Sequence, residues 1–238
     1  PSPVVEHVSQ PVADLAQRCE RPRVVAIGED AAAPERMAIE PPRARDLEAL
    51  HAARERLRVG LVGEQLDVDF VLYDYRGYGD SSGTPDEQGT YADGRAGYDW
   101  LVARGVPASR IVLFGESLGC AVSVQLALDR GARGLILEAP FASIRAMAQR
   151  VVPWLPIGAL LRTRYDNEGK IARVQVPLLV LHGTADEVIP FAQGEAVFRA
   201  AREPKRFVPV PGAHHNDVYL VGGADYLSAI AEFLRGLP

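Results

Sequence analysis

The sequence has little cysteine and no long apolar run. Cys19 and Cys120 are its only cysteines, and because they lie about a hundred residues apart they predict no disulfide framework. We therefore expect reduced thiols and a cytoplasmic location. No run approaches the roughly 18 to 20 apolar residues of a transmembrane helix, and residues 1–23 lack the apolar block of a signal peptide. The first residue is not methionine, which predicts a trimmed or incomplete chain and leaves a removed leader open.

Lysine is equally scarce. Of the 26 basic residues only Lys170 and Lys205 are lysine, and the arginines are scattered without a run, against 31 acidic residues and a net charge of −5. Such a distribution lacks the electrostatic footprint of a nucleic-acid-binding protein. With 47% hydrophobic and 24% charged residues, the composition is that of a globular protein and excludes disordered and coiled-coil classes.

What is present, from about residue 68 onward, is an alternation of short apolar runs with helix-length amphipathic stretches. The runs predict strands at 69–75, 110–115, 134–140, 177–183 and 206–210. The stretches between them predict helices at 90–105, 118–131, 190–202 and 223–237. Apolar strands that alternate with helices predict an α/β fold, a doubly wound and mostly parallel sheet.

Two segments depart from this alternation. Residues 141–171 are too long for a simple connection and too apolar for a solvated loop, so they predict a short helical cap insert, either a packing layer or a lid with an acyl pocket. In residues 1–67 only a strand at 23–28 and a helix within 43–66 can be suggested. We predict one domain over residues 1–238, with 1–67 as its divergent or incomplete N-terminal part.

The sharpest motif is Gly115-Glu116-Ser117-Leu118-Gly119, between an apolar strand and a helical pattern. A tight turn between a strand and a helix strains the backbone and exposes the serine at the carboxyl edge of the sheet. There the N-terminus of the helix lies beside the hydroxyl, and the backbone N–H of Leu118 can donate to an oxyanion. Ser117 is therefore a candidate nucleophile.

A serine nucleophile needs a base, and the base needs an orienting carboxylate. The loop 211–217 follows a late strand and contains His214 and His215, one of which is the candidate base. The loop 183–190 offers Asp186 and Glu187 as the acid, and Asp186 is favoured because the chain order Ser117, Asp186, His215 is that of α/β-hydrolases.

Several other polar residues have competing interpretations. Glu138, at the end of another strand, is the alternative acid, whereas His182 is expected to hold a turn through a side-chain hydrogen bond. Cys120 has either a lowered thiol pKa at the helix N-terminus or, the favoured interpretation, the role of a small buried apolar residue. His214, His215 and Asp217 form a cluster without the spacing of known metal sites, and neither a metal nor another cofactor is expected.

Together these motifs resemble the α/β-hydrolase superfamily of serine hydrolases, and most of all the intracellular α/β-hydrolase-domain group that includes protein depalmitoylases and uncharacterised bacterial hydrolases. The resemblance runs from about residue 68 to the C-terminus. Its matching segments are DYRGYGDSSG (74–83), GESLG (115–119), LILEAPFAS (135–143), LHGTADEVIPF (181–191), EPKRF (203–207) and GAHHNDVY (212–219).

Carried over residue by residue, the resemblance implies that Ser117 is the nucleophile, Asp186 the acid and His215 the base. One feature of the family is missing, because no His-Gly that would complete the oxyanion hole precedes the segment 74–83. The favoured substitute is the loop around His51, with Ala53 as second donor, and the alternative is Gly28 after the strand at 23–28.

The expected function is hydrolysis of a carboxylic ester or thioester through an acyl-enzyme, with a small-molecule acyl substrate. Peptide or amide hydrolysis remains open, and so does a weakly active or binding protein without a full oxyanion hole. Depalmitoylation is not implied, since the lipidated cysteine-rich N-terminus of such enzymes has no counterpart here. The oligomeric state is left open. The expected substrate pocket draws on apolar residues of the insert: Phe141, Met147, Val151, Val152, Trp154, Leu155 and Leu160.

Overall fold

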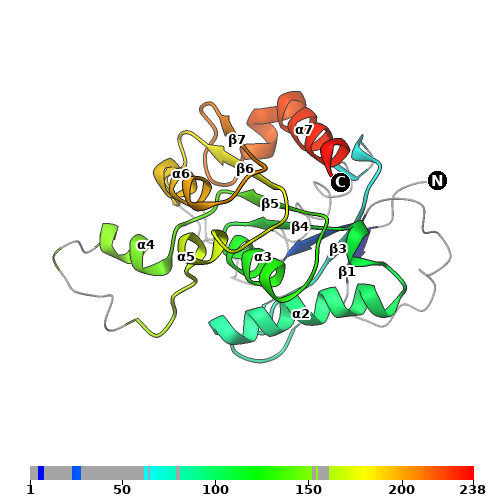
Figure 1. The fold of residues 1–238 in the computed structure, drawn as a ribbon. Helices are drawn as coiled ribbons and strands as arrows, with labels where there is room; N and C mark the ends of the chain where they lie inside the picture. Colours follow the sequence, from blue (N-terminus) through cyan, green and yellow to red (C-terminus); the bar gives the residue numbers. More distant parts are fainter. Residues whose placement is uncertain are drawn as a thin grey trace, which may run out of the picture.

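The computed structural model describes residues 5–7, 23–27, 62–63, 65–78, 81–151, 154 and 161–238. At its centre these residues form a seven-stranded sheet with the order β1-β3-β2-β4-β5-β6-β7, in which every adjacent pair is parallel (Figure 1). The strands are β1 (Val5–His7), β2 (Arg23–Ile27), β3 (Asp69–Leu72), β4 (Ile111–Glu116), β5 (Gly134–Glu138), β6 (Leu178–Gly183) and β7 (Lys205–Val210).

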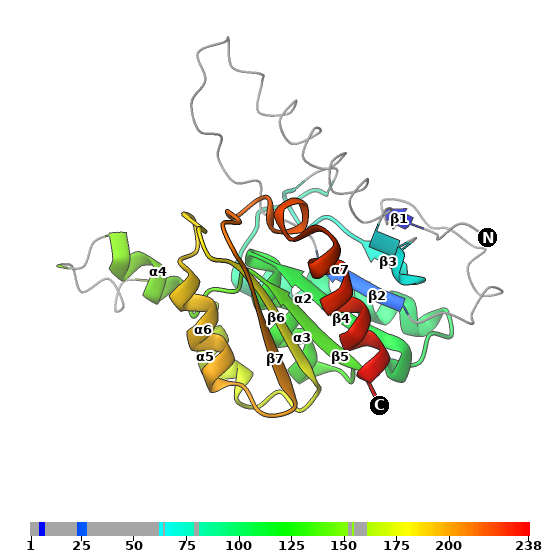
Figure 2. The ribbon, with the colours of Figure 1, turned by 90° about the horizontal axis from the view of Figure 1, so that it is seen from above.

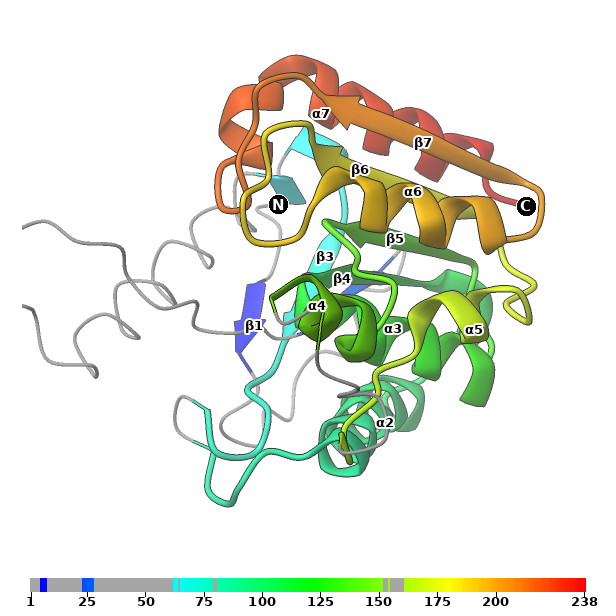
Figure 3. The ribbon, with the colours of Figure 1, turned by 90° about the vertical axis from the view of Figure 1, so that its left-hand side faces the viewer.

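Helices cover both faces of this sheet. They are α2 (Glu87–Ala103), α3 (Leu118–Asp129), α4 (Ile144–Val151), α5 (Asn167–Ile171), α6 (Phe191–Ala200) and α7 (Val218–Gly236), with a 3-10 turn, η1 (Ala108–Arg110), before β4. Helix α7 lies on one face and α2 and α3 on the other (Figure 1), and Figure 3 shows α6 covering β6. The predicted doubly wound α/β architecture is confirmed.

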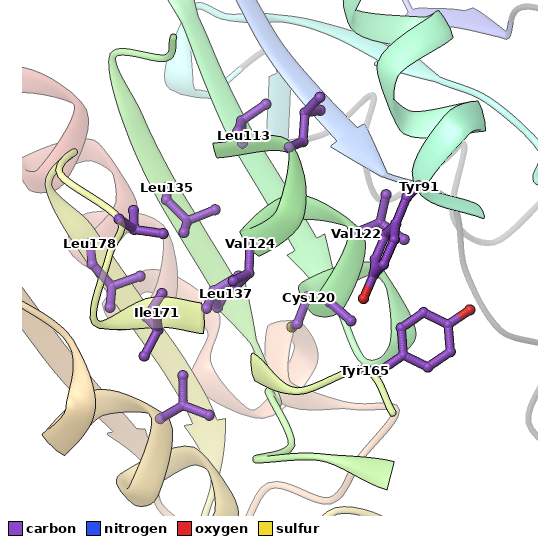
Figure 4. Packing of buried hydrophobic residues seen from close by; sticks show 14 of the residues in the cluster. Tyr91, Leu113, Cys120, Val122, Val124, Leu135, Leu137, Tyr165, Ile171 and Leu178 are labelled. Carbon is purple, nitrogen blue, oxygen red and sulfur yellow. The ribbon is translucent and has the colours of Figure 1, made fainter. Parts of the chain in front are cut away.

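Two hydrophobic clusters, one on each face, explain why the strands are apolar throughout. Successive residues of a strand point to opposite faces, so Val112 and Phe114 of β4 pack toward α7 while Leu113 packs toward α2 and α3. Figure 4 shows the cluster on the face covered by α2 and α3, in which Leu113, Leu135 and Leu137 of the sheet pack against α3. A sheet buried on both faces presents its polar groups only at its ends, and that is where the candidate site lies.

The predicted elements differ from the observed ones mainly at their ends. Helix α2 begins at Glu87, three residues before the predicted start, because the Asp86 side chain accepts a hydrogen bond of 2.7 Å from the Gly89 N–H and caps it. Helix α7 begins at Val218, five residues early, with Gly223 at φ 47° and ψ −124° inside it. Glycine adopts this conformation without strain, so the chain kinks there instead of beginning the helix.

The insert at 141–171 contains helices at both ends, α4 and α5. Its two ends are joined near the sheet, because Ile144 N–H donates to Arg164 O at 3.0 Å and Glu168 N–H donates to Ala142 O at 3.0 Å. Helix α4 extends away from the sheet (Figure 2). The predicted strand at 23–28 is observed as β2, whereas the helix predicted within 43–66 lies largely outside the described residues.

Candidate active site

Ser117 lies at the turn between β4 and α3, where its backbone has φ 51° and ψ −117°. Positive φ is unfavourable for a residue with a side chain, so the strain must be held by the surrounding structure. The Ser117 N–H donates to the Glu138 carbonyl of β5 at 3.0 Å, and the Ser117 carbonyl accepts from the Cys120 N–H at 3.1 Å. Both bonds fix the turn and leave the hydroxyl at the carboxyl edge of the sheet.

The glycine that opens the motif allows this turn to close. A Cβ at Gly115 would lie 2.4 Å from the Gly119 carbonyl oxygen and 2.6 Å from the Ser123 hydroxyl oxygen, so no larger residue fits there. Cys120, one turn into α3, is fully buried, and burial together with the nearby Glu116 and Glu138 carboxylates raises the pKa of its thiol well above the ordinary value. The lowered thiol pKa considered from sequence is wrong, and the alternative of a small buried apolar residue is confirmed.

Two side chains from two further loops line up beside the strained serine. Nε2 of His215 lies 3.1 Å from Ser117 Oγ, and Nδ1 of the same ring lies 2.8 Å from Asp186 Oδ2. The other carboxylate oxygen, Oδ1, accepts backbone N–H bonds from Val188 at 2.9 Å and Ile189 at 2.7 Å. The arrangement links a hydroxyl, an imidazole and a carboxylate in the order that base-assisted nucleophilic chemistry requires.

Burial and hydrogen bonding act in opposite directions on this imidazole–carboxylate pair. Burial by itself raises the pKa of Asp186, but hydrogen bonds from His182 and His215 outweigh it and hold that pKa well below its ordinary value. Burial lowers the pKa of His215, while the hydrogen bond to Asp186 and the charges of Asp186, Glu116 and Glu138 raise it above 6.5. Asp186 is thus ionised at neutral pH, and His215 is a base of increased strength.

A second imidazole–carboxylate pair lies directly outside the first. Nδ1 of His214 lies 2.9 Å from Glu187 Oε2, and the two side chains are 57% and 55% exposed. The hydrogen bond to Glu187 raises the pKa of His214. Burial raises the pKa of Glu187, but a backbone hydrogen bond and the bond from His214 outweigh it and lower that pKa. The residue pattern alone left His214 and His215 open, whereas chain order favoured Asp186 and the resemblance implied His215. The structure places the side chains of His215 and Asp186 beside Ser117.

The alternative acid, Glu138, bonds to helix α7. Its side chain is buried, and its Oε2 accepts a bond of 2.6 Å from the Tyr226 hydroxyl of α7. His182 was expected to hold a turn through a side-chain hydrogen bond, and its Nε2 lies 2.9 Å from the Ile189 carbonyl oxygen. His51 is outside the described residues, and only the backbone of His7, in β1, is described.

Comparison with known proteins agrees with this geometry. The family model described as serine aminopeptidase, S33, matches residues 63–165. An uncharacterized protein of Mycobacterium tuberculosis is 45% identical over 182 residues, which are 76% of this chain and 64% of that protein. Human alpha/beta hydrolase domain-containing protein 17B is 36% identical over 179 residues, covering 74% of this chain and 59% of that protein. The chain belongs to the α/β-hydrolase superfamily.

Solved α/β-hydrolase structures show the same fold over nearly the whole chain. An esterase domain from a Rhodothermus marinus protein has a TM-score of 0.56 at 19% identity, covering 91% of this chain and 86% of that one. A Xanthomonas campestris serine hydrolase, described as without a lid, also has a TM-score of 0.56, at 22% identity and coverages of 92% and 84%. This chain spans less than two thirds of the length of the curated relatives above.

Of the apolar residues expected to line a pocket, the structure describes the side chains of Phe141, Met147 and Trp154. Phe141 is buried in the core cluster that α3 shares, and Met147 packs partly against the same cluster. Trp154 is 78% exposed, so it does not line an enclosed pocket. Leu160 and the side chain of Val151 lie outside the described part of the chain.

Two backbone N–H groups, those of Leu118 and Ala53, were expected to donate to an oxyanion, and the structure describes the one of Leu118. Leu118 is the first residue of α3, and a backbone N–H in the first turn has no partner within its own helix. Ala53 and Gly28 lie outside the described residues. Strand β2 borders β4 on one side and places Ile27 opposite Gly115. Both candidate loops for the second donor lie outside the described residues, so the choice between them stays a prediction.

Two further expectations concern metals and membranes. Among the residues that the structure describes, no three His, Cys, Asp or Glu side chains are grouped as metal ligands would be, and His214, His215 and Asp217 form no such group. Within the same residues no helix combines the length and apolarity needed to cross a membrane.

Proposed function

We propose that this protein is a serine hydrolase that cleaves a carboxylic ester or thioester through an acyl-enzyme. The observation that carries the proposal is the 3.1 Å approach of His215 Nε2 to Ser117 Oγ, with Nδ1 of the same imidazole bonded to a buried carboxylate. A hydroxyl is a poor nucleophile at neutral pH, and a base at hydrogen-bond distance removes that limitation.

In the first half of the reaction, Ser117 Oγ attacks the acyl carbonyl carbon and its proton passes to His215 Nε2. The developing oxyanion is stabilised by the backbone N–H of Leu118 and by the positive N-terminus of α3. Collapse of the tetrahedral intermediate breaks the bond to the leaving oxygen or sulfur, which takes the proton from His215. Asp186 keeps Nδ1 protonated throughout and stabilises the imidazolium.

In the second half, a water molecule loses a proton to His215 Nε2 and attacks the acyl-enzyme carbonyl. Collapse releases the carboxylic acid and returns the proton to Ser117 Oγ. Hydrolysis of an amide or peptide uses the same steps with an amine leaving group, and the description of the matching family model as a serine aminopeptidase favours testing it.

A fluorophosphonate probe tests the nucleophile. We expect covalent labelling of the wild type at Ser117, detected by peptide mass spectrometry, and no labelling of Ser117→Ala. An intact, folded wild type that is not labelled would show a hydrolase fold used for binding, whereas labelling that persists in Ser117→Ala would show that another serine is the nucleophile.

A matched set of p-nitrophenyl esters, thioesters and aminoacyl p-nitroanilides then identifies the bond cleaved. We expect turnover of the esters and thioesters, absent in Ser117→Ala. Preferential cleavage of the anilides would instead assign the protein to the peptidases. Varying the acyl length tests the insert: a flat profile argues against an acyl pocket, in keeping with the exposure of Trp154.

A further inference from the structure

A third histidine, His182, lies behind the carboxylate of the triad. It is the second-last residue of β6, and its side chain is fully buried. Its ring is held from the side of α6: Phe191 meets it edge-on at 5.6 Å between ring centroids, and a Cβ at Gly194 would lie 2.2 Å from its Nδ1. The glycine therefore leaves room for the imidazole, and the ring has no space to rotate away from the loop it faces.

The free end of this ring points at the loop that carries Asp186. Nε2 of His182 lies 2.9 Å from the Ile189 carbonyl oxygen and 3.4 Å from Asp186 Oδ2. Both neighbours are hydrogen-bond acceptors, so Nε2 must carry the proton. Nδ1, which faces Gly194, has no hydrogen-bond partner among the described residues, as fits its unprotonated form.

These contacts join His182 to the triad at two places. Asp186 Oδ2, the oxygen near His182 Nε2, is also the oxygen bonded to His215 Nδ1 at 2.8 Å. Ile189, whose carbonyl accepts from His182, donates its own N–H to Asp186 Oδ1 at 2.7 Å. A change at His182 therefore reaches the carboxylate directly and also through the Ile189 backbone.

We propose that His182 is a positioning residue of the triad, which holds the Asp186 carboxylate in the orientation that His215 requires. The inference rests on the proposed function, since it assigns Asp186 a catalytic task. An imidazole that only completes the core would need no polar atom aimed at a reactive carboxylate. His182 Nε2, in contrast, shares that carboxylate oxygen with the base, and small displacements of an orienting group lower turnover without weakening substrate binding.

The test compares His182→Leu, which removes the donor, with His182→Gln, whose amide nitrogen reaches about as far as the imidazole Nε2. We expect His182→Leu to lower kcat on a short activated ester on the order of tenfold, with KM within about twofold of wild type. We expect His182→Gln to recover most of the lost turnover. Val180→Ala is the matched control, because Val180 is a buried apolar residue of the same strand and face, two residues before His182.

A second readout does not need turnover. The proton between His215 Nδ1 and Asp186 gives a downfield proton NMR resonance, which we expect to be displaced in His182→Leu and unchanged in Val180→Ala. Wild-type kcat and an unmoved resonance in His182→Leu would overturn the proposal, and so would equal losses in the control. If the wild type neither binds the fluorophosphonate nor turns over esters, the proposed function fails, while the resonance still reports whether His182 positions the carboxylate.

Gly194→Ala provides an independent variant if His182→Leu does not fold. It keeps the imidazole but places a Cβ 2.2 Å from the present position of Nδ1, so the ring or helix α6 must shift. We expect a loss of kcat with KM unchanged and a displaced resonance. A folded Gly194→Ala protein with wild-type kcat and resonance would contradict the positioning role.

Discussion

The two imidazole–carboxylate pairs at the edge of the sheet are built from adjacent residues of the same two loops, yet they differ in almost every physical respect. The His215–Asp186 side chains are 3% and 0% exposed, whereas those of His214 and Glu187 are 57% and 55% exposed, at nearly equal distances of 2.8 Å and 2.9 Å. An ion pair in water is screened and contributes little, while a buried carboxylate acts on its partner at full strength. Similar geometry therefore does not imply a similar role, and burial separates the two.

The largest difference is expected on removing the imidazoles. His215→Ala leaves Ser117 without a base and should lower kcat by about 10⁴–10⁶. His214→Ala removes only a solvated pair and should change kcat by less than about threefold. Steady-state kinetics on one activated ester measures both, and a large loss in His214→Ala with normal His215→Ala activity would reverse the assignment of the base.

Substitution of the two carboxylates should also lower kcat much more in the buried pair than in the exposed pair, although the loss should be somewhat smaller than for the imidazoles. Asp186→Asn keeps the shape of the side chain but removes the charge that stabilises the imidazolium, and should lower kcat by about 10⁴. Glu187→Gln should stay within about threefold of wild type. Activity retained in Asp186→Asn would show that another acid, with Glu138 as first candidate, orients His215.

The pH dependence of kcat/KM separates the two histidines without mutating the triad. His215 acts as a base only when neutral, so activity should fall about tenfold per pH unit below its pKa in the free enzyme. Because the bond to Asp186 outweighs burial and raises this pKa, the acid limb should have its midpoint above 6.5. His214→Ala should leave the midpoint in place. An acid limb whose midpoint shifts in His214→Ala, or whose midpoint lies below pH 6.5, would contradict the assignment of His215 as the base.

The smallest expected effect is the contribution of the exposed pair to stability. The pKa of His214 is raised from 6.5, so its contribution is complete below 6.5 and is lost as pH rises through the folded-state pKa. The pKa of Glu187 is lowered from 4.5, so its contribution is complete above 4.5 and is lost as pH falls through the folded-state pKa.

The pair should therefore stabilise the fold most between pH 4.5 and 6.5. Thermal unfolding of wild type and His214→Ala should differ by a small Tm shift in that window, which disappears in about 1 M salt because the Debye length falls to about 3 Å. A shift that persists in salt, or is largest at pH 9, would mean that His214 stabilises the protein by packing instead of charge.

The strands and the nucleophile turn could be predicted because their causes are local. The run 111–114 is apolar on both faces because it is buried on both faces, and Gly115 is required by contacts within a few residues of the turn. The start of α7 at Val218 was missed, because Gly222 and Gly223 read as a boundary although the chain only kinks there. Local patterns do not show whether a glycine ends a helix or bends it.

The pocket was the least predictable part of the candidate site. An apolar insert predicts burial of Trp154, but an apolar pattern does not show which side chains reach the core, and Trp154 is 78% exposed. The contact of His182 with Asp186 was also outside the reach of sequence. A histidine at the end of a strand suggests a turn bond, and nothing in the local pattern shows that its donor reaches a carboxylate as well.

By itself the sequence determined the α/β architecture, the serine at the turn, and the loops that supply an acid and a base, because chain order and local backbone preferences are written in neighbouring residues. The resemblance implied His215 and Asp186, but the residue pattern alone did not separate His214 from His215, and only the tertiary structure shows that His215 meets Asp186 while His214 meets Glu187. Those partners lie 27 and 29 residues apart, and adjacent residues of a loop have nearly the same sequence context. Packing against the sheet buries one pair and leaves the other in water, and that difference sets their charges and their roles.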